Sequence, residues 1–252
     1  MKIVIIKSTI ATLIVILATL LFREAFSSED LLADVSGLGA FVTVFGTLYG
    51  IMAAFIVFEV WGQYNKTAAL VAQEAQGLER LYRLAIYFRD EKLSREIKET
   101  ITAYSKLIIA GKFQKLGSGQ RNKENGIVFR RIAEIIKGIT FDDDHDHVVF
   151  DHVVSHYGKL SEIRTERITQ SLTRLPFLLK FFLYLGSFIT IFIFITMPFT
   201  NTFFNLFTAG TIGFVISMVL QLVDDLDNPF VGHWNITPEP FVRTLEHIEQ
   251  DY

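Results

Sequence analysis

The sequence contains no cysteine, which excludes disulfides, thiolate metal sites and cysteine nucleophiles and leaves no information on the redox compartment. It also lacks an excess of basic residues: 24 lysines and arginines stand against 27 acidic residues, a formal net charge of −3. Because nucleic-acid-binding domains carry basic patches, we expect no nucleic-acid partner. Phosphate-binding glycine loops, nucleophile elbows and HExxH motifs are missing as well, so we do not expect an enzyme.

Hydrophobic residues make up 50% of the 252 positions, and 24 of them are phenylalanines. They gather in runs that approach or reach the length a helix needs to cross a bilayer. The runs cover residues 8–22, 39–65, 177–197 and 203–223. We therefore predict an all-α fold: a four-span integral membrane protein with a cytoplasmic helical bundle inserted between spans 2 and 3.

The first run, residues 8–22, is short and follows Lys2 and Lys7. Its length fits either a secretory signal or a membrane anchor. No clean small-residue cleavage site follows Arg23, and Lys7 can lengthen the usable span by snorkelling. We favour a retained first helix over a cleaved signal.

The second run divides into two faces at helical spacing. One face carries small residues: Gly46, Gly50, Ala54 and Val57. The opposite face carries Val44, Leu48, Met52, Phe55 and Glu59. Small residues let two membrane helices approach closely, so we expect one face to pack tightly and the other to meet a different environment.

Glu59 lies inside the second run rather than after it. An ionisable group at such a depth usually faces a protein interior or a wet cavity, which makes Glu59 a candidate site residue. Two alternatives stay open. Glu59 belongs to an interfacial belt with Trp61 and Gln63, or it serves as the proton relay of a transporter.

Between the second and third runs, apolar residues recur at helical spacing among polar ones, as in amphipathic helices exposed to water. The second helix should continue beyond Gln63. Further helices are predicted at residues 91–113, 127–137 and 146–174, with a loop at 117–126. The predicted domains are transmembrane helices 1 and 2 (1–63), a cytoplasmic helical region (64–175), transmembrane helices 3 and 4 (176–223) and a cytoplasmic C-terminal tail (224–252).

Basic residues flank the helical region, whereas the connector at 23–34 is acidic and the connector at 198–202 is uncharged. Because lysine and arginine accumulate on the cytoplasmic side of membranes, we expect the helical region and both termini to be cytoplasmic. The flanking residues are Lys66, Arg80, Arg83, Arg89, Arg164, Arg167 and Arg174.

Acidic residues gather where the fourth run ends, followed by three prolines that argue against a continuous helix. Oxygen-rich loops of this kind suit calcium, and calcium is the one cofactor that the sequence suggests. The candidate ligands are Asp224, Asp225, Asp227 and Asn228. The alternative is that these aspartates cap backbone amides or pair with basic residues near the membrane. Residues 242–252 close the chain as a short polar stretch.

A second acidic cluster, rich in histidine, lies between residues 142 and 156. The pairs His147 with Asp151 and His152 with His156 stand at i and i+4, a spacing that can present two ligands to a transition metal. The same residues also fit the acidic first turn of a solvated helix, and both interpretations stay open.

Three segments, GTLYGIMAAFIVFEVWGQYNKTAALVAQEAQGLERLYRLA, SEIRTERITQSLTRLP and LVDDLDNPFVGHWNITPEPF, resemble the bestrophin-like family of bacterial membrane proteins over most of residues 37–241. Bestrophins, the distant relatives that give the family its name, are pentameric four-span anion channels with a cytoplasmic helical region and a calcium clasp. Asn228, Pro229 and Phe230 match the clasp's Asn-Pro-Phe-Gly segment, but Val231 precedes Gly232 and the acids come before the motif.

The resemblance implies a homo-oligomeric, pentameric anion channel of the bacterial inner membrane, with membrane lipid and small ions as its other partners. The second helix would line the pore, with Met52, Phe55 and Phe58 as an apolar constriction that gates by dewetting. A ring of Glu59 carboxylates at its mouth would favour cations, so Glu59 faces a neighbouring helix, is protonated, or belongs to a channel that is not anion-selective. The alternative function is a non-conducting scaffold or signalling adaptor that acts through its cytoplasmic helices.

Overall fold

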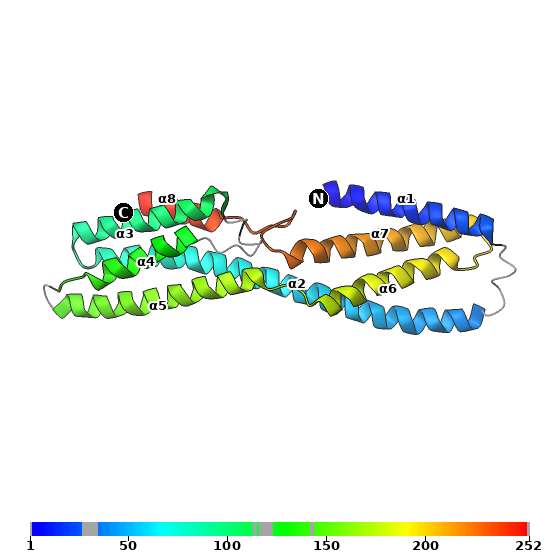
Figure 1. Cartoon of the computed structure of the whole chain (residues 1–252), viewed down its shortest axis with the longest axis horizontal. Helices are drawn as coiled ribbons and strands as arrows, with labels where there is room; N and C mark the ends of the chain where they lie inside the picture. Colours follow the sequence, from blue (N-terminus) through cyan, green and yellow to red (C-terminus); the bar gives the residue numbers. More distant parts are fainter. Residues whose placement is uncertain (1, 27–34, 113–114, 116–122, 142–143, 251–252) are drawn as a thin grey trace. The chain divides into compact units, whose positions relative to one another are not determined.

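The computed structural model describes residues 2–26, 35–112, 115, 123–141 and 144–250 (Figure 1). Within these ranges every regular element is helical and none is a strand, which confirms the all-α prediction. The helices are α1 (Lys2–Ala25), α2 (Val35–Ile86), α3 (Glu91–Leu107), α4 (Lys123–Lys137), α5 (Asp144–Leu172), α6 (Phe177–Thr196), α7 (Thr202–Asp227) and α8 (Glu239–Gln250), and a short π-helix, η2 (Ile108–Lys112), extends α3.

The chain forms two compact units, and α2 contributes to both. Unit 1 comprises residues 1–62 and 174–227, and unit 2 comprises residues 63–173 and 228–252. Among the described residues, four helices could cross a membrane by their length and composition: α1, α2, α6 and α7. The predicted membrane segments thus correspond to helices, while their topology stays a prediction.

Within unit 1, α1 packs along α7 (Figure 1). Small residues make this contact close: a Cβ atom added to Gly213 would lie 2.9 Å from the Cγ2 atom of Val15. Gln221 also donates a hydrogen bond of 2.8 Å to the Ser8 hydroxyl. Close packing of small side chains and hydrogen bonds between helices are the usual means by which membrane helices associate.

Unit 2 has a hydrophobic core built from the second part of α2 together with α3, α4, α5 and α8. Residues 242–250, predicted above only as part of a polar stretch, belong to the amphipathic helix α8. Phe241, Thr244 and Ile248 of α8 are buried, and the Thr244 hydroxyl donates to the Ala75 carbonyl at 3.0 Å. Helix α8 is therefore part of this core.

Candidate functional site

In unit 1, α2 contacts α6 along one narrow stripe. The Tyr49 ring lies against Gly186, where an added Cβ atom would lie 2.3 Å from the ring's Cδ2 atom. The Tyr49 and Ser187 hydroxyls share a hydrogen bond of 2.6 Å, and Ile56 and Val60 are buried on the same stripe. An apolar cavity of about 260 Å³ separates the rest of this side of α2 from α6.

Among the described residues, nothing packs closely against the two glycines of the small-residue face of α2, and a cavity lies between Gly50, Ala54 and Val219 of α7. A Cβ atom added to Gly46 or Gly50 would find no atom of the described structure within 4 Å, and Ala54 is exposed. Small residues on a membrane helix usually mark a close approach by another helix. This face is therefore open to a partner.

The four residues predicted to line a pore are also accessible in the single chain. Phe55 is 69% exposed and Phe58 is 75% exposed. Met52 is less exposed and borders the cavity beside α6, and Glu59 is exposed one residue beyond Phe58. They share one broad, outward-facing surface of α2, and their role in a pore stays a prediction.

The three aspartates of the predicted calcium site lie in the last turn of α7. The prediction that they lie in a loop is wrong, because α7 continues for four residues beyond Val223 to Asp227. Asn228 follows in unit 2, where its carbonyl accepts the N–H of Val231 at 3.1 Å.

Asp227 is buried and has two partners within unit 1. The N–H of Leu175 donates to its Oδ1 atom at 2.5 Å, and the Lys180 ammonium lies 2.7 Å from its Oδ2 atom. Asp224 accepts a hydrogen bond from the Tyr184 hydroxyl. This arrangement agrees with the alternative interpretation, in which the aspartates cap an amide and pair with a basic residue.

In the described ranges no three histidine, aspartate or glutamate side chains are grouped so that they could hold a metal ion. Of the histidine-rich cluster, Asp142 and Asp143 lie outside the described residues. His156 points to α2, where its Nε2 atom lies 2.8 Å from the Gly77 carbonyl, and burial lowers the pKa of this imidazole. Metal binding at either acidic cluster stays a prediction.

Sequence reasoning missed a buried ionic network in unit 2. Glu74 of α2 is fully buried and pairs with Arg167 of α5, and the Tyr104 hydroxyl of α3 donates to Glu74 at 2.5 Å. Arg164 donates to the Tyr104 hydroxyl at 3.1 Å. Three helices therefore meet at one carboxylate.

The protonation states of Tyr104 and Arg167 suit their hydrogen bonds to the Glu74 carboxylate. Burial raises the pKa of Tyr104, and the charge of Glu74 raises it further, so this hydroxyl keeps its proton and remains a donor. Burial by itself would lower the pKa of Arg167, but the neighbouring Glu74 outweighs it and raises that pKa. The signal in the sequence was an acid on the helical face that also carries Ala75 and Leu78.

The sequence matches a family model, and the fold is similar to that of solved structures. A family model described as a bestrophin-like domain matches residues 8–241. No curated protein matches the chain. Crystal structures of a bacterial bestrophin homologue from Klebsiella pneumoniae are similar in fold. A tryptophan-to-alanine variant is 12% identical with a TM-score of 0.74, covering 98% of this chain and 96% of that chain. A leucine-to-threonine variant is 13% identical with a TM-score of 0.73, covering 97% and 98%.

Proposed function

Because the chain belongs to the bestrophin-like family, we propose that it forms a homo-oligomeric ion channel in the bacterial inner membrane. α1, α2, α6 and α7 span the bilayer, and α2 lines the pore. Unit 2 and both termini lie in the cytoplasm. The permeant ions are anions and the assembly is a pentamer, as the bestrophin resemblance implies.

The observation that carries this proposal is the exposure of α2. In its most apolar window only 6% of the residues are buried, against 17% in α1, 22% in α6 and 28% in α7. A span that serves only to anchor the chain needs no pattern on its exposed surface. α2 instead presents a small-residue face on one side and large apolar side chains with a carboxylate on the other.

Each face has a role in an oligomer. Gly46 and Gly50 leave room for a helix of the neighbouring copy, so they form the subunit contact. Met52, Phe55 and Phe58 then point to the shared axis and form an apolar constriction that opens and closes by dewetting. Glu59 follows directly after Phe58, at the mouth of this constriction.

The subunit contact is tested by Gly50→Leu. A Cβ atom added to Gly50 would have no described atom within 4 Å, so the protomer should fold while the oligomer dissociates. Light scattering of the purified protein in detergent measures the mass. Thr211→Leu, on an exposed position of α7, is the control and should leave the oligomer intact. Wild-type protein that is monomeric, or Gly50→Leu protein that assembles normally, would refute the proposed contact.

Conduction is tested with purified protein in liposomes under separate chloride and potassium gradients, with and without calcium. A reproducible conductance whose reversal potential follows chloride supports an anion channel. A response to calcium that is lost in Asp224→Asn would support the predicted calcium site. Silence in every condition, from protein shown to be folded and oligomeric, would refute the channel and favour the scaffold function.

The pore face is tested by introducing single cysteines along residues 48–63. We expect a water-soluble thiol reagent to label positions 52, 55 and 59 periodically, while positions 50 and 54 are protected by the neighbouring copy. Uniform protection along the helix would contradict a pore and would fit a simple anchor.

A further inference from the structure

The part of α2 that belongs to unit 2 separates its charged side chains by sign. Residues 63–86 contain two acids, and both are buried: Glu74 is 0% exposed and Glu79 is 8% exposed. The three bases of the same stretch, Lys66, Arg80 and Arg83, are all exposed. The exposed face of α2 in unit 2 therefore carries bases and no acid.

Other helices of unit 2 expose charges of both signs, as is usual for a helix face in water. The exposed charged residues include Glu91, Lys92, Arg95 and Glu99 on α3 and Asp151, Lys159 and Glu162 on α5. The absence of exposed acids is therefore a property of the α2 face and not of unit 2 as a whole.

Two of the three bases on this face are neutralised by acids. Lys66 lies 2.8 Å from Glu166, and Arg83 pairs with Glu79 one turn earlier. Arg80, by contrast, has no acid within 4 Å in the part of the chain that the structure describes. Its positive charge is the uncompensated one on the exposed face of α2.

The exposed residues of this face recur at intervals of seven. They form two rows, Lys66, Gln73 and Arg80 in one and Ala69, Gln76 and Arg83 in the other, and all six are exposed. A strict seven-residue repeat keeps one seam of a helix facing a common axis when several helices coil together. Glutamines and bases are costly in a dry helical core, so this seam suits a water-filled space between helices.

The same seven-residue interval leads back from Lys66 to Glu59 and from Glu59 to Met52. These are two of the residues that the proposed function places on the ion pathway. Residues with one spacing on one helix are thus apolar at Met52, acidic at Glu59 and basic at Arg80.

We propose that Arg80 is an anion-selectivity residue of the channel. In each copy its guanidinium faces the aqueous cytoplasmic part of the pathway and attracts small inorganic anions such as chloride. Rings of basic side chains select anions and rings of acids select cations, so the Arg80 ring opposes the Glu59 ring and accounts for anion conduction in its presence. This inference rests on the proposed function, because it needs an oligomer with α2 along the pore.

The charge at position 80 is varied in purified protein reconstituted in liposomes under a potassium chloride gradient. The reversal potential gives the permeability of chloride relative to potassium. At about 0.1 M salt we expect this ratio to fall about threefold or more in Arg80→Gln and further in Arg80→Glu, while Arg80→Lys stays near the wild type. The differences should grow at about 0.01 M salt, where the screening length rises from about 10 to about 30 Å. A change in packing would follow neither the charge nor the salt.

Arg95→Gln is the matched control, because it removes the same charge from an exposed position of α3 and should leave the ratio unchanged. Light scattering verifies that every variant assembles like the wild type. A conducting wild type whose selectivity is unaltered in Arg80→Gln and Arg80→Glu, or altered equally in Arg95→Gln, overturns this inference and leaves the channel standing. A wild type that is silent overturns both.

Discussion

Arg167→Met should destabilise unit 2 far more than the loss of an ordinary ion pair. Arg167 is 2% exposed and Glu74 is fully buried, so the substitution leaves a buried carboxylate whose one remaining partner in the network is the Tyr104 hydroxyl. Removing one partner of a buried pair typically costs about 3–5 kcal/mol. At about 2–4 °C per kcal/mol for a chain of roughly this size, the melting temperature should fall by about 6–20 °C.

The reference substitution is Lys66→Met, which breaks the 2.8 Å pair of Lys66 with Glu166. Both side chains of that pair are about half exposed, so the cost should be about 1 kcal/mol or less. Thermal unfolding in detergent, followed by circular dichroism, measures both variants under identical conditions. The comparison isolates the effect of burial, because each variant replaces one base with methionine.

A double variant, Glu74→Gln with Arg167→Met, separates the charge from the packing. It removes the stranded carboxylate, so most of the stability lost in Arg167→Met should return, giving a strong coupling energy in the double-mutant cycle. Hydrogen exchange of α2 backbone amides in unit 2 should follow the same order. The reasoning is refuted if Arg167→Met costs no more than Lys66→Met, or if the double variant is less stable than the single one.

Three further predictions concern other sites. Glu59→Gln should raise chloride permeability relative to potassium at low salt and less so at high salt, since screening weakens a carboxylate ring; unchanged reversal potentials would show that Glu59 lies off the ion pathway. Gly186→Ala should lower the melting temperature, because its Cβ atom would lie 2.3 Å from the Tyr49 ring, whereas Gly46→Ala should not. Burial lowers the pKa of His156, so the unfolded chain binds its proton more readily, and stability should fall as pH drops below about 6.5. His156→Gln should reduce this loss in pH-dependent unfolding.

The spans were predictable because a bilayer demands long apolar runs, and the runs beginning at Phe177 and Phe203 leave little ambiguity. The position at which α7 ends was not predictable from the sequence. The prolines after Asp227 suggested a loop, but Lys180 and the Leu175 amide, some 50 residues earlier in the chain, stabilise the aspartates within the last helical turn. Local propensity contains no information on such distant partners.

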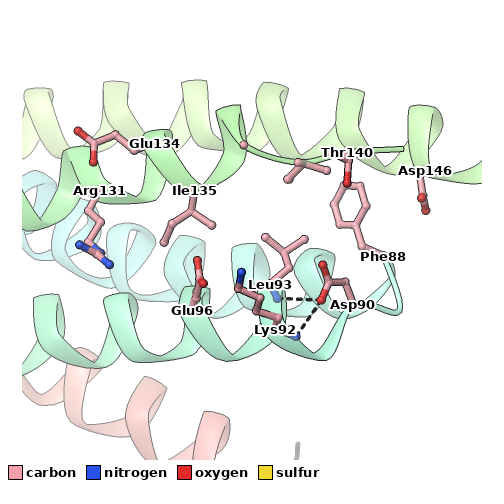
Figure 2. Close-up of a pocket in the computed structure, with 12 residues that line it drawn as sticks. Phe88, Asp90, Lys92, Leu93, Glu96, Arg131, Glu134, Ile135, Thr140 and Asp146 are labelled. Carbon is pink, nitrogen blue, oxygen red and sulfur yellow. Dashed lines mark hydrogen bonds between the residues drawn. The ribbon is translucent and has the colours of Figure 1, made fainter. Parts of the chain in front are cut away.

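A cavity between α3 and α4 in unit 2, lined in part by Lys92, Glu96 and Arg131 (Figure 2), shows the same limit in another form. Lys92 and Glu96 look like an ordinary solvated pair on one helix face in the sequence, and Arg131 looks like one of two exposed arginines. Only the packing of α3 against α4 brings their charges to one space. A buried partner for Glu74 was easier to predict, because a lone acid on an apolar helical stripe must pair with another group or lose its charge.

The faces of α2 pose a different problem, because in a membrane the usual contrast between apolar inside and polar outside disappears. Phe55 and Phe58 have the character expected of a lipid contact, a subunit contact or a hydrophobic gate, and hydropathy alone distinguishes none of these. What differs is access to water, which only a chemical probe reports. The absence of cysteine is an advantage here, because every introduced thiol is the only one in the chain. Labelling at position 55 but not at position 50 would therefore assign the two faces directly, with no background reaction to subtract.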